Sequence, residues 1–290
     1  MISEFSVQFP VQELCEVLGV SRSGYYGWRT AMPSKREQEN EKLIQEIGRV
    51  HQEHKQRYGS PRIARALQGQ GMICSENRVA RLMKQNGICA REKRAFRPRT
   101  TVRAKQEIIA PNLLKNEPSL LKELNRVWLG DITYIATEEE WLYLAGLMDL
   151  ASRKIAGWAL EEQMPTQLAE LALNRALMQR APTPGLIAHS DRGSQDTSRC
   201  YQQRLQTLKI RPSMSAIGYC FDNATMESFW STLKTEALPD TGIFESKQQA
   251  KLCLFEYIEI DYNKKRLHSA LDYMSPEAFE AKLTTEKINS

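Results

Sequence analysis

The residues best suited to chemistry are three carboxylates on three separate segments. Asp131 lies inside a β-rich run at 127–136, Asp191 directly follows a short apolar run at 186–190, and Glu227 lies in a helical stretch. A charge inside an apolar strand is costly unless something pairs with it, and strand ends in α/β sheets commonly carry functional groups. Three convergent carboxylates suit hard, oxygen-seeking cations. We therefore predict a site for two Mg²⁺ or Mn²⁺ ions, which clamp the attacking and leaving oxygens of an in-line phosphoryl displacement.

The elements that must position these acids alternate between strands and helices. Since the chain contains 35 acidic residues, spacing alone is a weak signal, and the prediction depends on each acid lying on a rigid element. Alternating and continuous apolar runs mark the strands, whereas helical periodicity marks the segments between them. The predicted strands are 127–136, 141–150, 154–160, 186–190 and 210–214, and the predicted helices are 166–180, 197–208 and 223–237. Three consecutive strands followed by alternating helices and strands predict an α/β domain with a mixed sheet.

The N-terminal third has an all-α pattern with two helix-turn-helix outlines. In the first, an apolar helix at 11–18 ends at Gly19, and Ser21 caps a short second helix. In the second, Ser60 and Pro61 begin one helix and Ser75 caps the next. Two such units favour DNA binding through a helix in the major groove, although small all-helical packing units have the same pattern. The basic candidates for DNA contact here are Arg62, Arg78 and Arg81.

A basic segment joins this region to the α/β part. Residues 90–105 hold seven basic side chains against one acid, and Pro98 makes a regular helix unlikely, so we interpret the segment as a linker. It is either a solvated tether or an arm that contacts phosphates, because Lys and Arg release counterions on binding DNA. The candidates for phosphate contact are Arg91, Lys93, Arg94, Arg97 and Arg99.

Composition excludes several classes of protein. The chain has 290 residues, a net charge of +5 and no apolar run longer than eight residues, whereas a membrane span needs about 20. We expect no membrane association and no secretory signal. Six cysteines without a CxxC pair indicate reduced thiols in a cytosol. His51, His54, Cys74 and Cys89 lack the close cysteine spacing of structural zinc sites, so we reject a zinc interpretation.

Three sequence blocks carry a family resemblance. WLGDITY at 128–134, HSDRGS at 189–194 and DNATMES at 222–228 resemble the catalytic blocks of the DDE transposases, which belong to the retroviral-integrase-like superfamily with a ribonuclease-H-like core. The 35 residues between Asp191 and Glu227 (192–226) match the family's spacing.

The regions on either side of these blocks extend the resemblance to most of the chain. Downstream, YNKKRLH at 262–268 and LDYMSP at 271–276 resemble the tail of bacterial insertion-sequence transposases, and upstream YGSPRI at 58–63 resembles their helix-turn-helix block. From about residue 11 to 279 the chain is most similar to the second-reading-frame (OrfB) type. Two positions depart from the family pattern. Gly130 stands where Thr is frequent, which can mark a close backbone approach or a bulge, and Asp272 stands where Gly is usual.

The resemblance implies a function. Asp131, Asp191 and Glu227 would hold the two metal ions while water hydrolyses a phosphodiester at the 3′ end of the element, and the freed 3′-hydroxyl would attack a second phosphodiester. The implied partners are double-stranded DNA, namely the terminal inverted repeats and the target, further copies of the chain on that DNA, and the first-frame product. The implied location is the bacterial cytoplasm, in association with the nucleoid.

Further residues are candidates for contact with DNA. Asn223 and Lys234 share the helix face of Glu227, and Lys234 stands where the family carries a basic residue. His189 lies on the same strand face as Asp191, so it touches DNA or a ligand carboxylate, or is a satisfied histidine at the edge of the core. Arg266 and His268 are either DNA contacts or salt-bridging surface groups. Asp149 fits a strand-end polar role better than a catalytic one.

These observations predict five regions and leave two other functions open. The regions are 1–33 and 34–89, each with a helix-turn-helix outline, a basic linker at 90–122, an integrase-like core at 123–240 and a helical tail at 241–290. The alternatives are a non-catalytic helix-turn-helix regulator with a degenerate core, and a structure-specific nuclease on the same core. Cleavage without joining would identify the nuclease.

Overall fold

The computed structural model divides the chain into two compact units, Met1–Ala90 and Arg91–Ser290. It describes residues 1–91, 110–114, 117–163, 166–182, 184–191, 199–215 and 223–288. No helix within those ranges is long and apolar enough to cross a membrane.

The first unit is entirely helical, which confirms the prediction for this region. Its helices are α1 (Ile2–Phe5), α2 (Val11–Val17), α3 (Arg22–Thr30), α4 (Lys35–Glu53), α5 (Ser60–Gly69) and α6 (Glu76–Gln85). The predicted caps Ser21 and Ser75 are confirmed, because their side chains accept hydrogen bonds from the first turns of α3 and α6. Ser34 caps α4 in the same way. Helix α5 begins one residue earlier than predicted, with Gly59 as its N-cap.

The two helical parts of this unit differ in how much they bury. Helices α4, α5 and α6 pack against one another around Ile47, Val50, Ile63 and Leu67, all with side chains 0% exposed. Helices α1 to α3 bury only Cys15 and Tyr25.

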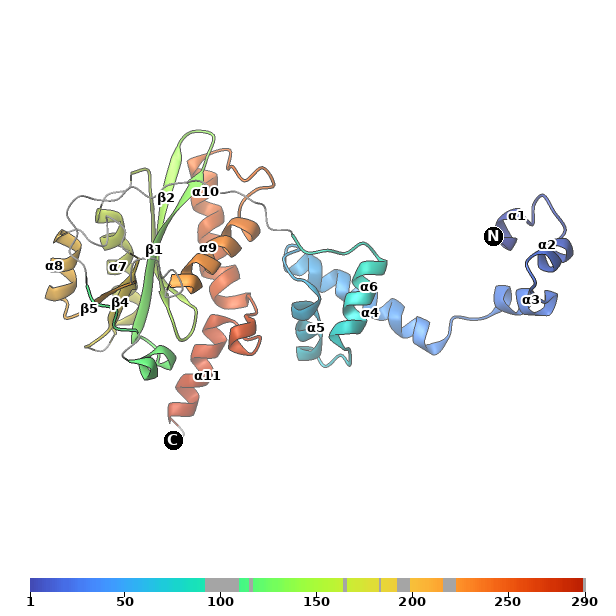
Figure 1. The fold of residues 1–290 in the computed structure, drawn as a ribbon, viewed down its shortest axis with the longest axis horizontal. Helices are drawn as coiled ribbons and strands as arrows, with labels where there is room; N and C mark the ends of the chain where they lie inside the picture. The colour runs from blue at the N-terminus through green and yellow to red at the C-terminus, as the bar shows by residue number, and fades with distance from the viewer. Residues whose placement is uncertain are drawn as a thin grey trace. The chain divides into compact units, whose positions relative to one another are not determined.

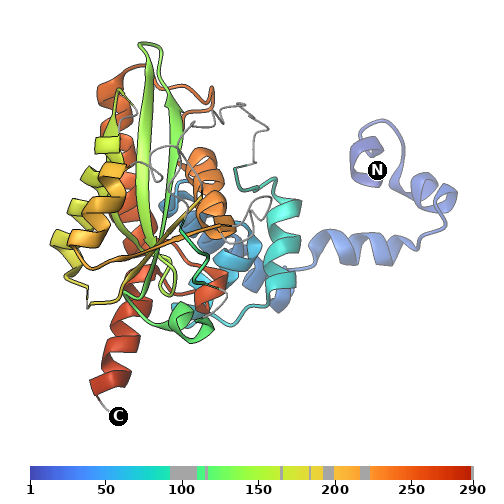
Figure 2. The same ribbon diagram turned by 60° about the vertical axis from the view of Figure 1, so that its left-hand side comes forward.

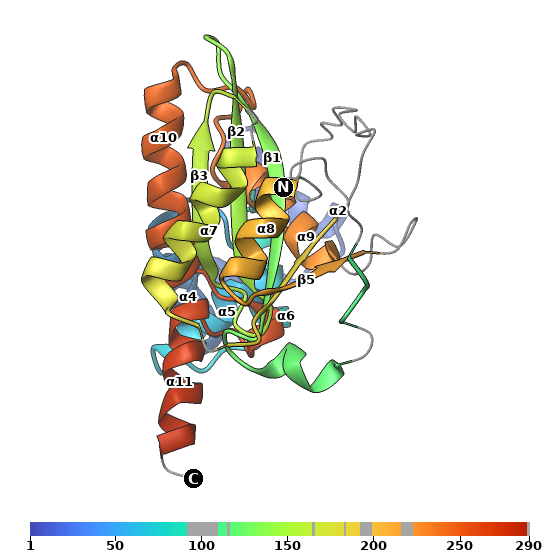
Figure 3. The ribbon, with the colours of Figure 1, turned by 90° about the vertical axis from the view of Figure 1, so that its left-hand side faces the viewer.

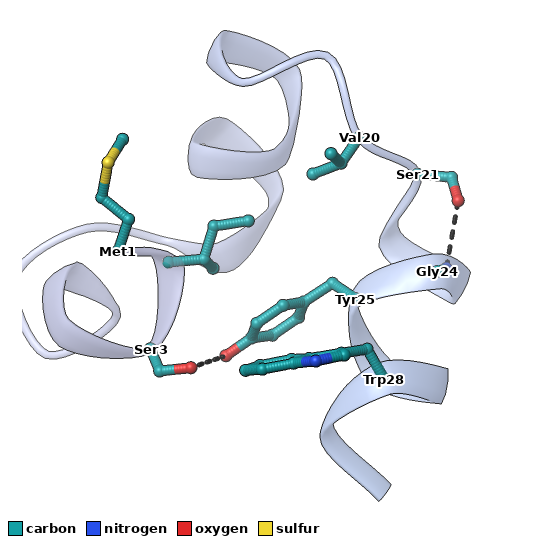
Figure 4. Close-up of a pocket in the computed structure, with 8 residues that line it drawn as sticks. Met1, Ser3, Val20, Ser21, Gly24, Tyr25 and Trp28 are labelled. Carbon is teal, nitrogen blue, oxygen red and sulfur yellow. Dashed lines mark hydrogen bonds between the residues drawn. The ribbon is translucent and has the colours of Figure 1, made fainter. Parts of the chain in front are cut away.

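An apolar hollow of about 480 Å³ is lined by α1, the turn between α2 and α3, and α3 (Figure 4). Tyr25 and Trp28 lie side by side in it, and the Tyr25 hydroxyl lies 3.5 Å from the Ser3 hydroxyl. Trp28 is 69% exposed there, so this part of the unit leaves much apolar surface uncovered.

The second unit is built on a mixed five-stranded sheet in the order β3-β2-β1-β4-β5 (Figure 1). Strands β1, β2 and β3 form an antiparallel meander, and β4 and β5 add parallel to the β1 edge. The strands are β1 (Val127–Ala136), β2 (Trp141–Asp149), β3 (Ile155–Glu161), β4 (Ile187–Ser190) and β5 (Arg211–Met214). The predicted mixed sheet is confirmed, with bounds within one or two residues of the sequence pattern.

Helices cover both faces of the sheet (Figures 1 and 3). Helices α7 (Thr166–Arg180) and α8 (Arg199–Thr207) lie on one face, whereas α9 (Ala224–Glu236), α10 (Lys247–Phe255) and the π-helix η3 (Glu256–Lys265) lie on the other. Strand β1 contributes side chains to both faces, because Val127 and Leu129 pack toward α9 while Trp128 packs toward α7. Helix α7 approaches β3 so closely that a Cβ on Gly157 would lie 2.5 Å from the backbone nitrogen of Ala176.

The C-terminal segment completes the core of this unit. Leu254, Tyr257 and Ile258 belong to the same buried cluster as the sheet residues Leu129 and Leu144. The start of α10 also lies beside the tip of the β1–β2 hairpin, where Lys247 pairs with Glu140 at 2.9 Å (Figure 2). The described residues also form the 3₁₀ segments η1 (Pro118–Lys122) and η4 (Ser269–Leu271) and the helix α11 (Pro276–Ile288). The finer regional boundaries stay predictions.

Two side-chain contacts attach the tail to the sheet. The Asn263 side chain in η3 accepts from the backbone N–H of Ile155 at 2.9 Å and donates to its carbonyl at 3.1 Å, as a neighbouring strand would. In α11, Glu280 pairs with Arg180 at 2.7 Å and with Lys154 at 3.4 Å. The edge strand β3 is therefore partly covered by the tail.

Candidate active site

Two of the three predicted acids lie side by side on neighbouring strands. Strands β1 and β4 are parallel, with Gly130 beside Ser190, so Asp131 and Asp191 are the next residues along. Neighbouring strands are about 4.8 Å apart. Asp131 lies within β1 and is half-buried, whereas Asp191, which directly follows β4, is exposed.

Helix α9 brings the third acid to the same face. The Trp230 indole Nε1 donates to Asp131 Oδ2 at 2.9 Å, and the backbone N–H of Ile132 donates to Asp131 Oδ1 at 2.8 Å. Glu227 lies one turn before Trp230 on α9 and is exposed. Helix α9 therefore places Glu227, an exposed side chain, on the same face as the half-buried Asp131.

The charges of Asp191 and Glu227 both act on Asp131. Burial, followed by the charge of Asp191, raises the pKa of Asp131 to about 7, and Glu227 raises it further, while the hydrogen bonds from Ile132 and Trp230 oppose the shift. Lys234 is half-buried on α9, where burial lowers its pKa and the charge of Asp131 opposes that shift. The charges of Lys234 and Asp131 therefore interact.

The donor set fits hard divalent cations. Carboxylate oxygens are the ligands that such ions prefer, and among the described residues no Lys or Arg forms a salt bridge with Asp131. Within that same part of the chain, no three Asp, Glu, His or Cys side chains are gathered closely enough to enclose one ion. Among the described residues, the arrangement is a half-buried carboxylate without an ion-pair partner, with two like charges within electrostatic range.

His189 is not available to DNA. Its side chain is 0% exposed, with Nδ1 lying 2.9 Å from the Ser213 hydroxyl and Nε2 lying 3.1 Å from the Ser215 hydroxyl. The predicted DNA contact is therefore wrong, and the alternative of a satisfied histidine at the edge of the core is the one observed. Its ring ties the end of β4 to the end of β5.

Asn223 and Lys234 also differ from the open rim that the helix face predicted. Asn223 precedes α9 as its N-cap and is only 3% exposed, so an open DNA contact through its side chain does not fit. Lys234 is half-buried and faces Asp131 electrostatically rather than lying on a solvated rim. Trp230 is a site residue that was not predicted from the sequence. Its position three residues after Glu227 was the available signal.

Arg266 is a structural residue and not a DNA contact. It is 8% exposed, and its guanidinium makes a two-pronged ion pair with Glu236 at the end of α9, with Nη2–Oε1 at 2.8 Å and Nε–Oε2 at 2.9 Å. Tyr257 donates to the same carboxylate at 2.9 Å. The predicted DNA contact is wrong because this cation is committed to a buried acid. His268 is half-buried and packs edge-on against Tyr262 at 4.8 Å between ring centroids.

Three further positions explain points left open by the sequence. Asp149 is 0% exposed and accepts from the backbone N–H groups of Asn125 and Ser152, so it anchors the β2–β3 turn. Asp272 has φ 51° and ψ 39°, the left-handed region that favours Gly. At Gly130 the β1–β2 register is regular, so there is no bulge, and a Cβ would lie 3.2 Å from Leu147 Cδ2.

The three basic candidates in the helical unit have different surroundings. Arg62 lies over the Tyr58 ring at 5.6 Å. Arg78 is half-buried and donates to the Asn40 side chain at 3.0 Å, whereas Arg81 is exposed.

Of the five basic candidates in the linker, Arg91 lies within the described residues. Arg91 lies 3.5 Å from the carbonyls of Glu236 and Leu238 within its own unit. Lys93, Arg94, Arg97 and Arg99 lie outside the described residues.

Comparisons with known proteins agree with this architecture. Residues 122–220 and 208–276 each match an integrase core domain, and residues 37–96 match an HTH-like domain. The chain is 43% identical over 269 residues to the 31 kDa protein of insertion element IS600 from Shigella sonnei, covering 93% of this chain and 98% of that protein. It is 39% identical over 283 residues to the transposase InsF for insertion sequence IS3A from Escherichia coli K12, covering 97% of each.

A solved structure is also similar. The catalytic domain of Mos1 mariner transposase aligns with a TM-score of 0.41 and 22% identity, covering 51% of this chain and 76% of that one. The mixed sheet and the matched domains define an integrase core of ribonuclease-H-like fold. Within that class, the chain belongs to the transposases of IS3-type insertion sequences.

Proposed function

We propose that this transposase cleaves phosphodiesters at the 3′ ends of its insertion sequence and joins the freed ends to target DNA, with Asp131, Asp191 and Glu227 as its metal ligands. The observation that carries the proposal is the position of Asp131, half-buried in β1 next to Asp191 on the neighbouring strand, where burial and the charge of Asp191 raise its pKa to about 7. A carboxylate with a raised pKa and acidic neighbours supports a role in binding cations.

The protein side chains contribute placement and charge. Asp131 is held by two N–H donors, Asp191 extends from β4, and Glu227 reaches the same face from α9. A pair of Mg²⁺ or Mn²⁺ ions would activate the attacking oxygen and stabilise the leaving oxygen of the displacement. Lys234, which faces the acids, would hold a phosphate of the terminal nucleotides as a mobile point charge.

The DNA partners follow from the same proposal. The HTH-like domain supports binding of the terminal inverted repeats by the helical unit, with Arg81 exposed on α6 for phosphate or base contact. We propose that further copies of the chain assemble on the DNA ends in the bacterial cytoplasm, and that the first-frame product contributes to end recognition.

The test is a cleavage and joining assay on duplexes that carry the element's ends, with Mg²⁺ or Mn²⁺. We expect wild-type protein to release 3′ ends and join them, whereas Asp131→Asn, Asp191→Asn and Glu227→Gln lose at least a thousandfold in rate and keep DNA binding. Glu138→Gln, an exposed acid in the β1–β2 turn, is the matched control and should retain full rate.

The outcomes separate the alternatives. Cleavage without joining would identify a structure-specific nuclease, and binding without divalent-dependent cleavage would identify a regulator. Near-wild-type joining by any one acid variant would remove that residue from the site.

A further inference from the structure

Among the described residues, Trp230 is the one side chain that donates a hydrogen bond to Asp131. Its indole lies beneath α9 and is 6% exposed, with Nε1 2.9 Å from Asp131 Oδ2. The other oxygen of Asp131 accepts from the backbone of Ile132 at 2.8 Å. Each carboxylate oxygen therefore has one protein donor.

This pattern determines what the carboxylate can still do. An ionised aspartate offers roughly four lone-pair sites, two on each oxygen. With one site on each oxygen occupied by an N–H donor, each oxygen keeps one site for a cation. The two donors also fix the plane of the carboxylate, which a free side chain could rotate.

The strand opposite leaves space for the indole. Gly146 on β2 pairs with Asp131 in the antiparallel register. A Cβ built on Gly146 would lie 2.9 Å from Trp230 Cη2 and 2.9 Å from Met226 Cε, closer than real Cβ contacts. The absent side chain at position 146 therefore allows the indole to lie beside Asp131.

One helix consequently carries two functions for the site. Trp230 follows Glu227 by three residues, so both lie on the same side of α9. Any shift of α9 that moves Glu227 also moves the donor to Asp131.

We propose that Trp230 is a positioning residue, which holds the Asp131 carboxylate in the orientation that binds the catalytic cations, and that Gly146 provides the space for its indole. The inference rests on the proposed metal site. Groups that orient metal ligands from behind typically change metal affinity or activity by about 10–100-fold when they are removed.

The chain offers a matched control for the indole. Trp158 Nε1 donates to Glu259 at 2.8 Å, in contact with the tail, on β3, two strands from Asp131. Trp230→Phe and Trp158→Phe therefore remove the same chemical group, an indole donor to a carboxylate, from two places. Only the first removal should affect the metal site.

The experiment measures Mn²⁺ binding to the DNA-free full chain by electron paramagnetic resonance, together with cleavage at saturating DNA. We expect Trp230→Phe to weaken Mn²⁺ binding about 10–100-fold and to slow cleavage, with partial recovery of the rate at higher Mn²⁺. Trp158→Phe should bind Mn²⁺ and cleave DNA like the wild type. Equal Mn²⁺ affinity of Trp230→Phe and the wild type would overturn the inference while leaving the proposed function intact.

A second variant keeps the test decisive if Trp230→Phe loses stability. Gly146→Ala displaces the indole without removing it, so it should also weaken Mn²⁺ binding. Because both changes act on the same hydrogen bond, the double variant should bind Mn²⁺ no more weakly than Trp230→Phe alone. Additive losses in the double variant would contradict the proposal. Wild-type protein that fails both to bind Mn²⁺ and to cleave would overturn the proposed function and this inference together.

Discussion

Two acidic centres lie against the same helix, α9, and differ in how their charge is balanced. At the end of α9, Glu236 is paired by Arg266 and accepts from the Tyr257 hydroxyl. Beside the middle of α9, Asp131 in β1 accepts from two N–H donors and has two neighbouring carboxylates. Glu236 is buried and Asp131 half-buried, and within the described part of the chain only Glu236 forms an ion pair with a protein cation.

The difference distinguishes a structural charge from a functional one. A buried ion pair that is complete within the protein fixes the position of elements, here the tail against α9. A buried carboxylate with neighbouring acids stores unfavourable electrostatic energy that a bound cation would relieve. The comparison therefore assigns stability to the Glu236 centre and ligand binding to the Asp131 centre.

The largest expected effect breaks the completed centre. Arg266→Ala should lower the free energy of unfolding by about 3–5 kcal/mol, because it leaves the Glu236 carboxylate buried without its partner. The measurement is urea-induced unfolding of the full chain. Lys282→Ala is the control, since its pair with Glu286 is 3.9 Å long and more than half exposed, and it should change stability by less than about 1 kcal/mol. Similar small losses in both variants would contradict the structural role of Arg266.

The next effect concerns the unbalanced centre and its pH dependence. Asp131 has a folded-state pKa of about 7, compared with 3.8 ordinarily, so between about pH 4 and 7 the unfolded chain releases a proton that the folded chain retains. Metal-free stability should therefore fall as pH rises through that window, by about 1.4 kcal/mol per pH unit from this group, and level off above it. Asp131→Asn should remove this component. Urea midpoints at pH 5, 6, 7 and 8 give the comparison, and parallel profiles for the two proteins would refute it.

The smallest effect concerns Lys234, which lies near the acids without neutralising them. Lys234→Ala should retain Mn²⁺ binding and weaken binding of end-containing DNA about tenfold, roughly 1.4 kcal/mol, with the cleavage rate recovered at higher DNA concentration. Glu227→Gln should not recover in this way, because its defect lies in the chemical step. Titration of both variants with DNA at fixed Mg²⁺ distinguishes them. If Lys234→Ala stays as inactive as Glu227→Gln at saturating DNA, the division of roles along α9 is wrong.

The sequence predicted the parts of this molecule that depend on local pattern. Strand alternation and helical periodicity placed β1, β4 and α9 closely, so the acids were assigned to the correct elements. It did not predict which polar side chains are buried. Arg266 pairs with Glu236, which lies 30 residues earlier in the chain, and His189 contacts Ser213 and Ser215, which lie 24 and 26 residues later. Neither contact produces a periodic pattern in the sequence.

The tail shows the same limit in its backbone. Residues 256–265 form a π-helix, which presents Asn263 to the edge of β3. Ordinary helical periodicity does not predict that geometry, since π-helices are rare and appear mostly as single-turn insertions in α-helices. The left-handed conformation at Asp272 was signalled only by the departure from the family's Gly.

The contact between Asn263 and Ile155 also bears on protein synthesis. These residues are 108 positions apart, so the edge of β3 stays unpaired by the tail until Asn263 has left the ribosome. At about 5–20 residues per second, that delay is on the order of 5–20 s. Helices α4 to α6 make their contacts within the first 90 residues and can complete them earlier. A nascent chain would thus complete its helical unit well before the tail covers the edge of its sheet.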